Sequence, residues 1–197
     1  VTLLDVTETV RLQEELDAAN ERLEAVAMLD SYQQQAEEDG LTRVPNRSGI
    51  RRRVAELLEG AGGRPCTFFM IDVDDFKAIN DTFGHPAGDG VLKALARHLR
   101  NTVRHDDVVG RMGGDEFVVF CMGLGEGPAR EALAARLRGW HFPHGRAGDD
   151  IDLGTPTLSM GVASSADSSV TLDDLYALAD AALYRSKEAG KDRVTFT

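Results

Sequence analysis

The sequence predicts an α+β fold: a ferredoxin-like core, in which helices pack on a central antiparallel sheet, preceded by a long N-terminal α-helix. Beyond residue 39, apolar strand-like runs and helical patterns follow one another in the order β-α-β-β-α-β-α-β. The run Cys66–Asp74 is apolar without alternation, which is typical of a central strand covered on both faces. Residues 9–38, in contrast, form a polar segment rich in Glu, Gln, Ala and Leu, which favours one long helix.

The N-terminal segment has the pattern of a coiled coil. Residues 1–8 begin with a short β-like run, and the polar segment 9–38 follows. Apolar residues within this segment recur in alternating steps of four and three, as in a coiled-coil seam: Leu12, Leu16, Ala19, Leu23 and Val26. A second apolar stripe lies in a shifted register: Leu29, Tyr32 and Ala36. Two interpretations stay open, a linker helix and a signalling helix whose two registers correspond to two dimer arrangements.

Glycine and proline interrupt the helical pattern between Asp39 and Arg47, so we place the boundary of a globular domain there, with the domain spanning 39–197. The pattern beyond the boundary predicts these elements in order: a helix at 47–59, a loop at 60–65, a strand at 66–74, helices at 75–80 and 88–103 separated by a Gly-rich loop, a hairpin, a helix at 127–139, an irregular loop at 140–154, a strand at 157–163, a helix at 172–189 and a closing strand at 193–196.

The predicted hairpin has an acidic tip. Between two runs of β-forming residues, Val108–Val109 and Phe117–Phe120, the chain reads Gly113-Gly114-Asp115-Glu116. The glycine pair supplies the positive φ angles that a two-residue connection needs. Two carboxylates are therefore expected to project together from a rigid edge. Taken alone, such a string is an ordinary solvated turn, so a functional site requires matching residues elsewhere in the chain.

Composition restricts the classes of function. The 197 residues, 42% hydrophobic and 28% charged, fit one globular domain with an accessory segment. A net charge of -11 argues against nucleic acid as a partner, because such binding depends on Lys and Arg neutralising phosphates. The sequence shows no membrane-spanning apolar run and no secretory pattern, which predicts a cytoplasmic location. Cys66 and Cys121 lie in apolar runs without metal-ligand spacing, so we expect buried, reduced thiols.

A second acidic pair ends the first central strand. Asp72 and Asp74 share one face there, because strand side chains alternate with a period of two. A carboxylate at a buried strand end is costly unless it is paired or bound to a metal. The hairpin lies on the neighbouring strand, so Asp72, Asp115 and Glu116 are expected to converge. A hard divalent cation, Mg²⁺ foremost, would relieve their repulsion, and Mg²⁺ in such sites usually also binds substrate phosphates.

From Asp39 to Phe196 the chain resembles the diguanylate cyclase (GGDEF) family, whose fold is the nucleotidyl-cyclase palm built on a ferredoxin-like core. Five motifs follow the family's order and spacing: Asp39–Arg47, Asp72–Lys77 with Asn80–Asp89, Gly113–Phe117, Leu158–Ala163 and Ala179–Lys187. Three departures from the family's pattern remove no expected ligand: Arg43 replaces a frequent Gly, Asp75 a frequent His or Phe, and Lys191-Asp192 the usual Arg-Asn.

The resemblance implies synthesis of cyclic di-GMP from two GTP molecules, with pyrophosphate released from each. It implies two Mg²⁺ ions per GTP, with Mn²⁺ as an alternative, held by Asp72, the Val73 carbonyl, Asp115 and Glu116. The three carboxylates are the implied catalytic residues, and Glu116 is a candidate for deprotonating the attacking 3′-hydroxyl, although metal coordination alone could suffice.

The resemblance also implies how this chain would bind its substrate. Lys77, Lys187 and Lys191 would bind phosphates, and the last two are expected on one helix face because they lie four residues apart. Asn80 and Asp89 would read the guanine edge. The other substrate-binding positions that it implies are Phe76, Gly113 and Gly114.

Each implied site would hold one GTP, so two copies of the domain must face each other, and we expect a homodimer formed through the coiled coil. The string Asp5-Val6-Thr7-Glu8 resembles the end of a PAS domain, which implies that residues 1–8 end an upstream sensor domain. Arg104-x-x-Asp107 resembles the family's inhibitory site for cyclic di-GMP, with Arg136 as a secondary contributor; the alternative is a surface salt-bridging pair.

Three classes of function remain open at this stage. The first is an active diguanylate cyclase, which the intact hairpin motif and the phosphate lysines favour. The second is a catalytically silent receptor or scaffold for cyclic di-GMP or GTP with the same fold. The third is a dimerisation and relay module. Incubation with GTP and Mg²⁺ separates the first from the others.

Overall fold

The computed structural model describes residues 10–13, 15–24, 28, 36–142, 156–167 and 169–197. The chain divides into two compact units, residues 1–37 and residues 38–197. In the part of the chain that the structure describes, no helix is both long and apolar enough to cross a membrane.

The first unit is helical at residues 10–13 and 15–24, in agreement with the predicted helix. Three leucines of the predicted seam are exposed on it, with exposed fractions of 60% for Leu12, 53% for Leu16 and 67% for Leu23. Three further predictions fall on Val26, on the stripe of Leu29 and Tyr32, and on the β-like residues 1–8, all of which lie outside the described residues.

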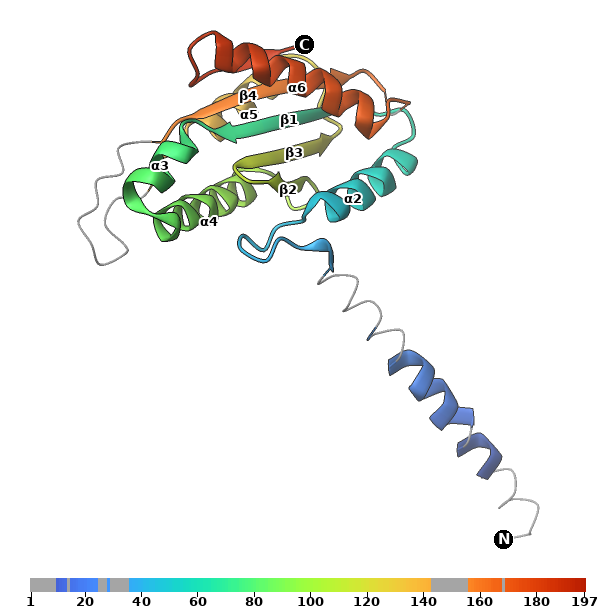
Figure 1. The fold of residues 1–197 in the computed structure, drawn as a ribbon. Coiled ribbons are helices and arrows are strands. Elements are labelled where there is room, and N and C mark those ends of the chain that lie inside the picture. The colour runs from blue at the N-terminus through green and yellow to red at the C-terminus, as the bar shows by residue number, and fades with distance from the viewer. Residues whose placement is uncertain (1–9, 14, 25–27, 29–35, 143–155, 168) are drawn as a thin grey trace. The chain divides into compact units, whose positions relative to one another are not determined.

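The second unit contains the predicted α+β core (Figure 1). Its elements in chain order are α2 (Arg47–Glu59), β1 (Cys66–Val73), α3 (Phe76–Phe83), α4 (His85–Thr102), β2 (Val108–Gly113), β3 (Glu116–Met122), α5 (Pro128–Arg138), β4 (Leu158–Ser165), α6 (Leu172–Glu188) and β5 (Val194–Phe196). The strands form one sheet in the order β2-β3-β1-β4-β5. The pairs β2/β3, β1/β3 and β1/β4 are antiparallel, and β5 adds to β4 in parallel. The first four strands give the expected ferredoxin-like order, and the parallel β5 makes the sheet mixed.

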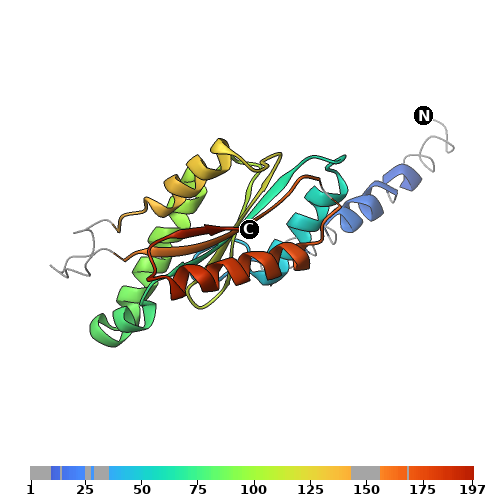
Figure 2. The same cartoon turned by 90° about the horizontal axis from the view of Figure 1, so that it is seen from above.

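Strand β1 lies at the centre, and all eight of its residues are buried. Phe69, Ile71 and Val73 face a cluster that contains the apolar residues of α4 and α5. Phe68 and Met70, which point to the opposite face, pack with α2 and α6. Figure 2 shows the helices on the two sides of the sheet. This two-sided burial explains why β1 has continuous rather than alternating apolar sequence.

Helix α6 approaches the sheet closely where it crosses β4. Gly161 of β4 has no side chain to separate the two elements, and a Cβ at this position would overlap the backbone of Ala179 and Leu183. Helix α6 begins with a capping box in which Thr171 and Asp174 exchange hydrogen bonds with each other's backbone. The close packing brings the C-terminal end of α6 next to the end of β1.

Two helix boundaries differ from the sequence prediction. The Gly-rich loop expected between the third and fourth helices is a single residue, Gly84, with φ 82°. Helix α4 begins at His85 because Pro86 lacks an N–H group and is tolerated in the first helical turn. Helix α6 ends at Glu188, and Gly190 has φ 107°. Lys191 is therefore not on the helix of Lys187, and the prediction that they share a helix face was wrong.

Candidate functional site

The predicted site lies at the end of the sheet where β1 ends, β3 begins and α6 ends (Figure 1). The antiparallel register of β1 and β3 places Asp72 directly opposite Glu116. Both residues lie on the α6 side of the sheet, because the alternate positions Ile71 and Phe117 belong to the core on the other side. The prediction that the strand end and the hairpin are neighbours is therefore confirmed.

Asp72 is a buried carboxylate with one close cationic partner. Its side chain is 7% exposed, and Lys187 Nζ donates a hydrogen bond of 2.7 Å to its Oδ2 atom. Burial raises the pKa of Asp72 to about 6, although the Lys187 ion pair opposes this rise, and the charges of Asp115 and Glu116 add to it. One lysine therefore does not compensate fully for the burial of this carboxylate among other acids.

Glu116 is likewise a partly buried carboxylate among other acidic residues. Burial and the charge of Asp115 raise its pKa, while Lys187 opposes the rise. Asp72, Asp115 and Glu116 thus repel one another across adjacent strands. Among the described residues, however, no group of three acidic, histidine or cysteine side chains forms a ready-made metal site. Asp115 and Glu116 lie close enough to Asp72 to raise its pKa, as expected, but the three carboxylates do not form a complete coordination shell for a metal ion.

The residues present nonetheless fit a divalent cation. Mg²⁺ prefers oxygen ligands and commonly takes only one or two carboxylates, with phosphate oxygens and water completing its coordination. Asp72 and Glu116 offer two carboxylates on paired strands. Burial raises both pKa values and repulsion from neighbouring acids adds to the rise, so an additional positive charge would favour the ionised forms.

The hairpin tip is fixed by glycine geometry and by one arginine. Gly113 and Gly114 have φ angles of 147° and 54°, as the glycine pair predicts, and a register shift between Arg111 and Gly113 adds an irregularity that the sequence did not indicate. Arg111 Nε and Nη2 donate hydrogen bonds of 3.0 and 2.6 Å to the Gly114 carbonyl oxygen. Its Nη1 donates to both carboxylate oxygens of Asp39, each at 3.0 Å.

Asp39 connects the hairpin to the loop that precedes α2. Besides Arg111, it accepts hydrogen bonds from the backbone N–H and the hydroxyl of Thr42, at 2.8 and 2.6 Å. Burial alone would raise the pKa of Asp39, but these hydrogen bonds outweigh burial and hold the pKa below its ordinary value. The beginning of the domain and the acidic hairpin are therefore joined by a largely buried ion pair.

Asp74 holds a second junction next to the site. Its carboxylate is 6% exposed and accepts hydrogen bonds from the Thr157 hydroxyl at 2.7 Å and the Ser159 hydroxyl at 2.6 Å. It also accepts a 3.1 Å hydrogen bond from the backbone N–H of Asp192. Asp74 thereby ties the end of β1 to the start of β4 and to the turn after α6.

The turn after α6 presents Lys191 in an unusual conformation. Lys191 and Asp192 are consecutive non-glycine residues with φ angles of 61° and 44°. Lys191 Nζ donates a 2.7 Å hydrogen bond to Asp75, which raises the pKa of Lys191. Lys187 and Lys191 thus reach the same strand end by two routes, one from the helix and one from the strained turn.

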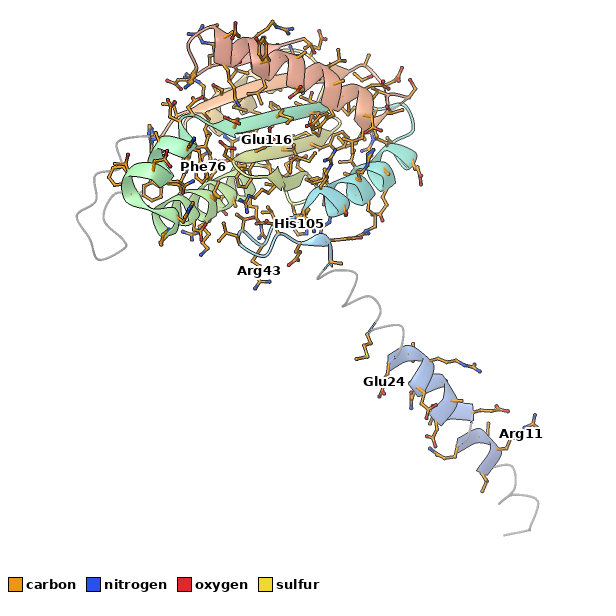
Figure 3. All side chains as sticks on the ribbon, in the orientation of Figure 1. Arg11, Glu24, Arg43, Phe76, His105 and Glu116 are labelled. Carbon is orange, nitrogen blue, oxygen red and sulfur yellow. The ribbon has the colours of Figure 1, made fainter. Side chains whose placement is uncertain are left out.

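The other predicted substrate-binding residues lie on α3 and α4. Phe76, Lys77 and Asn80 are on α3, and Asp89 is on the first turns of α4. A Cβ at Gly88 would overlap the Asn80 side chain, so the absence of a side chain there allows Asn80 to lie against the residue before Asp89. Figure 3 labels Phe76 on α3 and Glu116 on the neighbouring sheet. The structure therefore places Asn80 beside the helical turn of α4 that carries Asp89.

The predicted inhibitory residues line a separate cleft of about 150 Å³. Arg104, Asp107 and Arg136 all contribute to its lining. The Arg104 backbone N–H donates a 2.9 Å hydrogen bond to Asp107, and Arg136 Nη2 donates a 2.8 Å bond to the Thr102 carbonyl oxygen. The guanidinium of Arg104 forms no ion pair with Asp107 among the described contacts, so the simple salt-bridging pair considered from the sequence is absent from this part of the chain.

Sequence reasoning did not assign roles to four residues that position the site: Asp39, Arg111, Asp74 and Asp75. Each lies inside or beside a quoted motif, but its partner is far along the chain. Arg111 and Asp39 are 72 residues apart, and Lys191 and Asp75 are 116 residues apart. Such pairs become visible only when the strand order and register are known.

A ferredoxin-like sheet with carboxylates and lysines gathered at one end has the donor set of a metal- and phosphate-binding domain. Comparison with known proteins makes the class specific. The model of the family described as "Diguanylate cyclase, GGDEF domain" matches residues 36–193. The chain therefore belongs to this family.

Curated relatives agree with this assignment. The chain is 33% identical over 162 residues to the probable diguanylate cyclase DgcT of Escherichia coli strain K12, covering 81% of this chain and 35% of the relative. It is 35% identical over 174 residues to the diguanylate cyclase DgcP of Pseudomonas aeruginosa, covering 84% of this chain and 25% of the relative. The chain thus spans well under half the length of these two relatives.

Solved structures show the same fold. The coiled coil and GGDEF domain of DgcB from Caulobacter crescentus, in complex with c-di-GMP, has 28% sequence identity and a TM-score of 0.73. That similarity covers 94% of this chain and 99% of the DgcB chain. The diguanylate cyclase SiaD from Pseudomonas aeruginosa, in complex with its activator SiaC, has 31% identity and a TM-score of 0.68, covering 98% of this chain and 79% of the SiaD chain.

The raised pKa of Asp72 predicts how the end of β1 binds protons as the pH changes. Because the folded-state pKa of Asp72 lies near 6, above its ordinary value of 3.8, the native protein binds more protons than the unfolded chain between these pH values. The contribution of this carboxyl group to stability therefore falls as the pH rises through that window. Carbon-13 NMR titration of the metal-free protein should show the Asp72 carboxyl titrating near pH 6.

Two variants test separately how the charges of Lys187 and Asp115 change the pKa of Asp72. Lys187→Met should raise the Asp72 pKa further, because a hydrogen bond and a positive charge are lost, and Asp115→Asn should lower it. Asp167→Asn, at an exposed position beyond the far end of β4, serves as the control and should leave it unchanged. An Asp72 carboxyl that titrates at its ordinary value, or ignores Lys187→Met, contradicts this description.

Proposed function

We propose that this chain contains the catalytic domain of a diguanylate cyclase, which condenses two GTP molecules into cyclic di-GMP and releases two pyrophosphates. The observation that carries the proposal is the pairing of Asp72 with Glu116 at a buried strand end, beside Lys187. Family membership and the names of the relatives support the reaction class. The runner-up, a silent receptor for cyclic di-GMP or GTP, predicts binding without turnover.

In the proposed site the acidic residues hold metal and the lysines hold phosphate. Asp72, the Val73 carbonyl, Asp115 and Glu116 would hold Mg²⁺ or Mn²⁺, with two ions per GTP. These ions supply charge neutralisation for the triphosphate. Lys77 and Lys191 would bind phosphate oxygens, and Gly113 and Gly114 would let the backbone approach them closely.

Lys187 has a double role in this proposal. In the present structure its ammonium neutralises Asp72, at 2.7 Å. A bound triphosphate offers a stronger anionic partner, and a divalent cation takes over the neutralisation of the carboxylate. Lys187 would therefore turn from Asp72 to the phosphates when substrate binds. Its half-exposed side chain, 40% exposed, leaves room for this movement.

Guanine recognition is proposed for the junction of α3 and α4. Asn80 and Asp89 offer an amide and a carboxylate, and the carboxylate can accept hydrogen bonds from the N1–H and the exocyclic amine of guanine. Phe76, which packs partly against the core, supports the base-binding side of the same helix. Adenine lacks this donor pair, so the pair favours guanine nucleotides.

The reaction itself requires two copies of the domain. The 3′-oxygen of one GTP forms a bond to the α-phosphorus of the other, the bond from that phosphorus to pyrophosphate breaks, and the same exchange occurs in the opposite direction. Glu116 is proposed to accept the proton of the attacking hydroxyl, which is consistent with its raised pKa. One site supplies one GTP, so activity depends on how two copies face each other.

Turnover is the first test of the proposal. The purified chain with GTP and Mg²⁺ should produce cyclic di-GMP, detected by chromatography. Glu116→Gln should lower the rate by about 100-fold or more, because a metal ligand and a proton acceptor are both lost. The exposed Glu126→Gln serves as a control of equal charge change and should retain activity. GTP binding without product at high protein concentration would instead support the receptor.

Dimerisation through the N-terminal helix is the second test. Leu16→Gln with Leu23→Gln should weaken the dimer. Both leucines are exposed on the helix, and the glutamines that replace them cannot form the apolar contacts of a coiled-coil seam. Glutamine keeps helix propensity close to that of leucine. Activity should fall at low protein concentration and recover at high concentration, with the dimer measured by sedimentation.

The matched control for the dimer test is Asn20→Gln with Glu21→Gln, which changes two exposed residues outside the seam. This control should retain both the dimer and the activity. The proposal of catalysis by facing domains would be refuted by a Leu16/Leu23 variant that is monomeric and turns over at the wild-type rate.

Product feedback is proposed for the cleft of Arg104, Asp107 and Arg136. Cyclic di-GMP would bind there through phosphate or guanine contacts to Arg104 and guanine contacts to Asp107. Arg104→Ala should weaken cyclic di-GMP binding by about tenfold or more, the expected loss for a charge-assisted hydrogen-bonding group. Arg97→Ala, on an exposed position of α4 outside the cleft, should not. Calorimetry measures both; unchanged binding in Arg104→Ala would remove the feedback assignment.

A further inference from the structure

A small hollow of about 40 Å³ lies between α2 and α6, on the side of the sheet that carries the proposed site. Figure 2 shows the two helices on the same side of the sheet. Phe68 of β1, Met112 of β2 and Tyr176 of α6 line the hollow, together with Arg47 of α2. Met112 directly precedes the glycine pair of the hairpin, so the hollow borders the acidic hairpin tip.

The first turn of α2 is held against the hairpin by backbone contacts. The Arg111 N–H of β2 donates a 2.8 Å hydrogen bond to the carbonyl oxygen of Pro45, two residues before Arg47. Gly110 of β2 allows this approach, since a Cβ there would overlap the side chain of Ile50 and the Pro45 carbonyl oxygen. The beginning of α2, and with it Arg47, is therefore fixed next to the strand that pairs with the start of β3.

Arg47 lies within electrostatic reach of the acidic hairpin. Burial raises the pKa of Glu116, and the charges of Lys187 and Arg47 oppose this rise. Burial also raises the pKa of Tyr176, and the charge of Arg47 opposes that rise as well. Lys187 is already paired with Asp72 at 2.7 Å. Arg47 is therefore a second cation beside Glu116, and it comes from a different helix.

The charge of Arg47 has no partner within the part of the chain that the structure describes, where its exposed side chain takes part in no hydrogen bond or ion pair. Arg51, one turn further along α2, pairs with Asp173 at 2.7 Å. Arg47 is the first residue of α2, and the first turn contains no acidic residue. A cation is unfavourable there, because the N-terminus of a helix carries partial positive charge. The fold thus gains no ion pair from Arg47, and its charge is available to a substrate anion.

We propose that Arg47 is a further catalytic residue, which contacts the α-phosphoryl group of GTP while that group is transferred. This inference rests on the proposed cyclase function. In that reaction the 3′-oxygen forms a bond to the α-phosphorus, the bond to pyrophosphate breaks with its electron pair leaving on pyrophosphate, and Glu116 takes the proton of the hydroxyl.

A guanidinium group suits this role. Its planar set of N–H donors can contact two phosphoryl oxygens at once, which a lysine ammonium cannot do with the same geometry. A cation that is already in place before the reaction stabilises the charge on the phosphoryl group in the transition state. Arg47 would therefore increase the rate of transfer more than the affinity for GTP.

The test measures steady-state production of cyclic di-GMP from GTP and Mg²⁺ by the full chain. Arg47→Ala should lower kcat by about 100-fold and change KM for GTP by less than about threefold, because the lost contact acts mainly in the transition state. Arg47→Lys keeps the charge without the paired donors and should be about tenfold faster than Arg47→Ala. The control, Arg52→Ala, removes the same charge from an exposed position of the same helix outside the hollow and should keep the wild-type kcat.

Thermal unfolding of the same variants separates catalysis from a structural role. Arg47→Ala should leave Tm unchanged or raise it, because the arginine has no partner among the described residues and opposes the partial charge of the helix end. A lowered kcat with nearly unchanged KM and an undiminished Tm supports the inference.

Three results would overturn the inference and leave the proposed function intact: wild-type kcat in Arg47→Ala, an effect on KM alone, or a loss of activity that Arg52→Ala shares. A loss of activity accompanied by a lowered Tm would assign Arg47 a structural role and overturn it too. A wild-type chain that makes no cyclic di-GMP refutes the proposed function, and the inference with it.

Discussion

The rest of the site depends on one electrostatic conflict: a carboxylate buried at the end of the central strand, directly opposite a second carboxylate. Asp72 can be charged there only if a cation is nearby, and Lys187 supplies one at 2.7 Å. The lysine reaches this point because α6 packs directly on β4 over Gly161. The raised pKa of Asp72 shows that the compensation is incomplete. A metal ion can supply the positive charge that this site lacks, and the proposed GTP chemistry requires metal ions there.

Local sequence patterns were sufficient to predict most of the fold. Continuous apolar sequence identified β1, the glycine pair identified the hairpin, and the strand order followed the expected α+β core. The helix boundary at Gly84 was missed because the Gly-rich stretch was interpreted as a loop, whereas Pro86 occupies the first turn of α4. The neighbourhood of Asp72 and Glu116 was predictable because adjacent antiparallel strands bring a strand end beside a hairpin tip.

The contacts that position the site were not predictable in the same way. The carboxylate of Asp74 accepts two hydroxyl hydrogen bonds and one backbone hydrogen bond from residues more than 80 positions away in sequence. The left-handed backbone of Arg43 and Lys191 departs from the preference of non-glycine residues, and Lys191 also bonds Asp75, 116 residues away in sequence. Leu16 and Leu23 are exposed on the N-terminal helix, which is consistent with the proposed dimer.

We propose that the strand end exchanges its lysine for a metal ion when nucleotide binds. The most direct measurement is a crystal structure of the chain with a non-hydrolysable GTP analogue and Mn²⁺, located by its anomalous scattering. The account predicts Mn²⁺ coordinated by Asp72 and Glu116, with the Lys187 ammonium moved to a phosphate oxygen. A bound nucleotide with Lys187 still paired to Asp72, and no Mn²⁺ at the strand end, would contradict it.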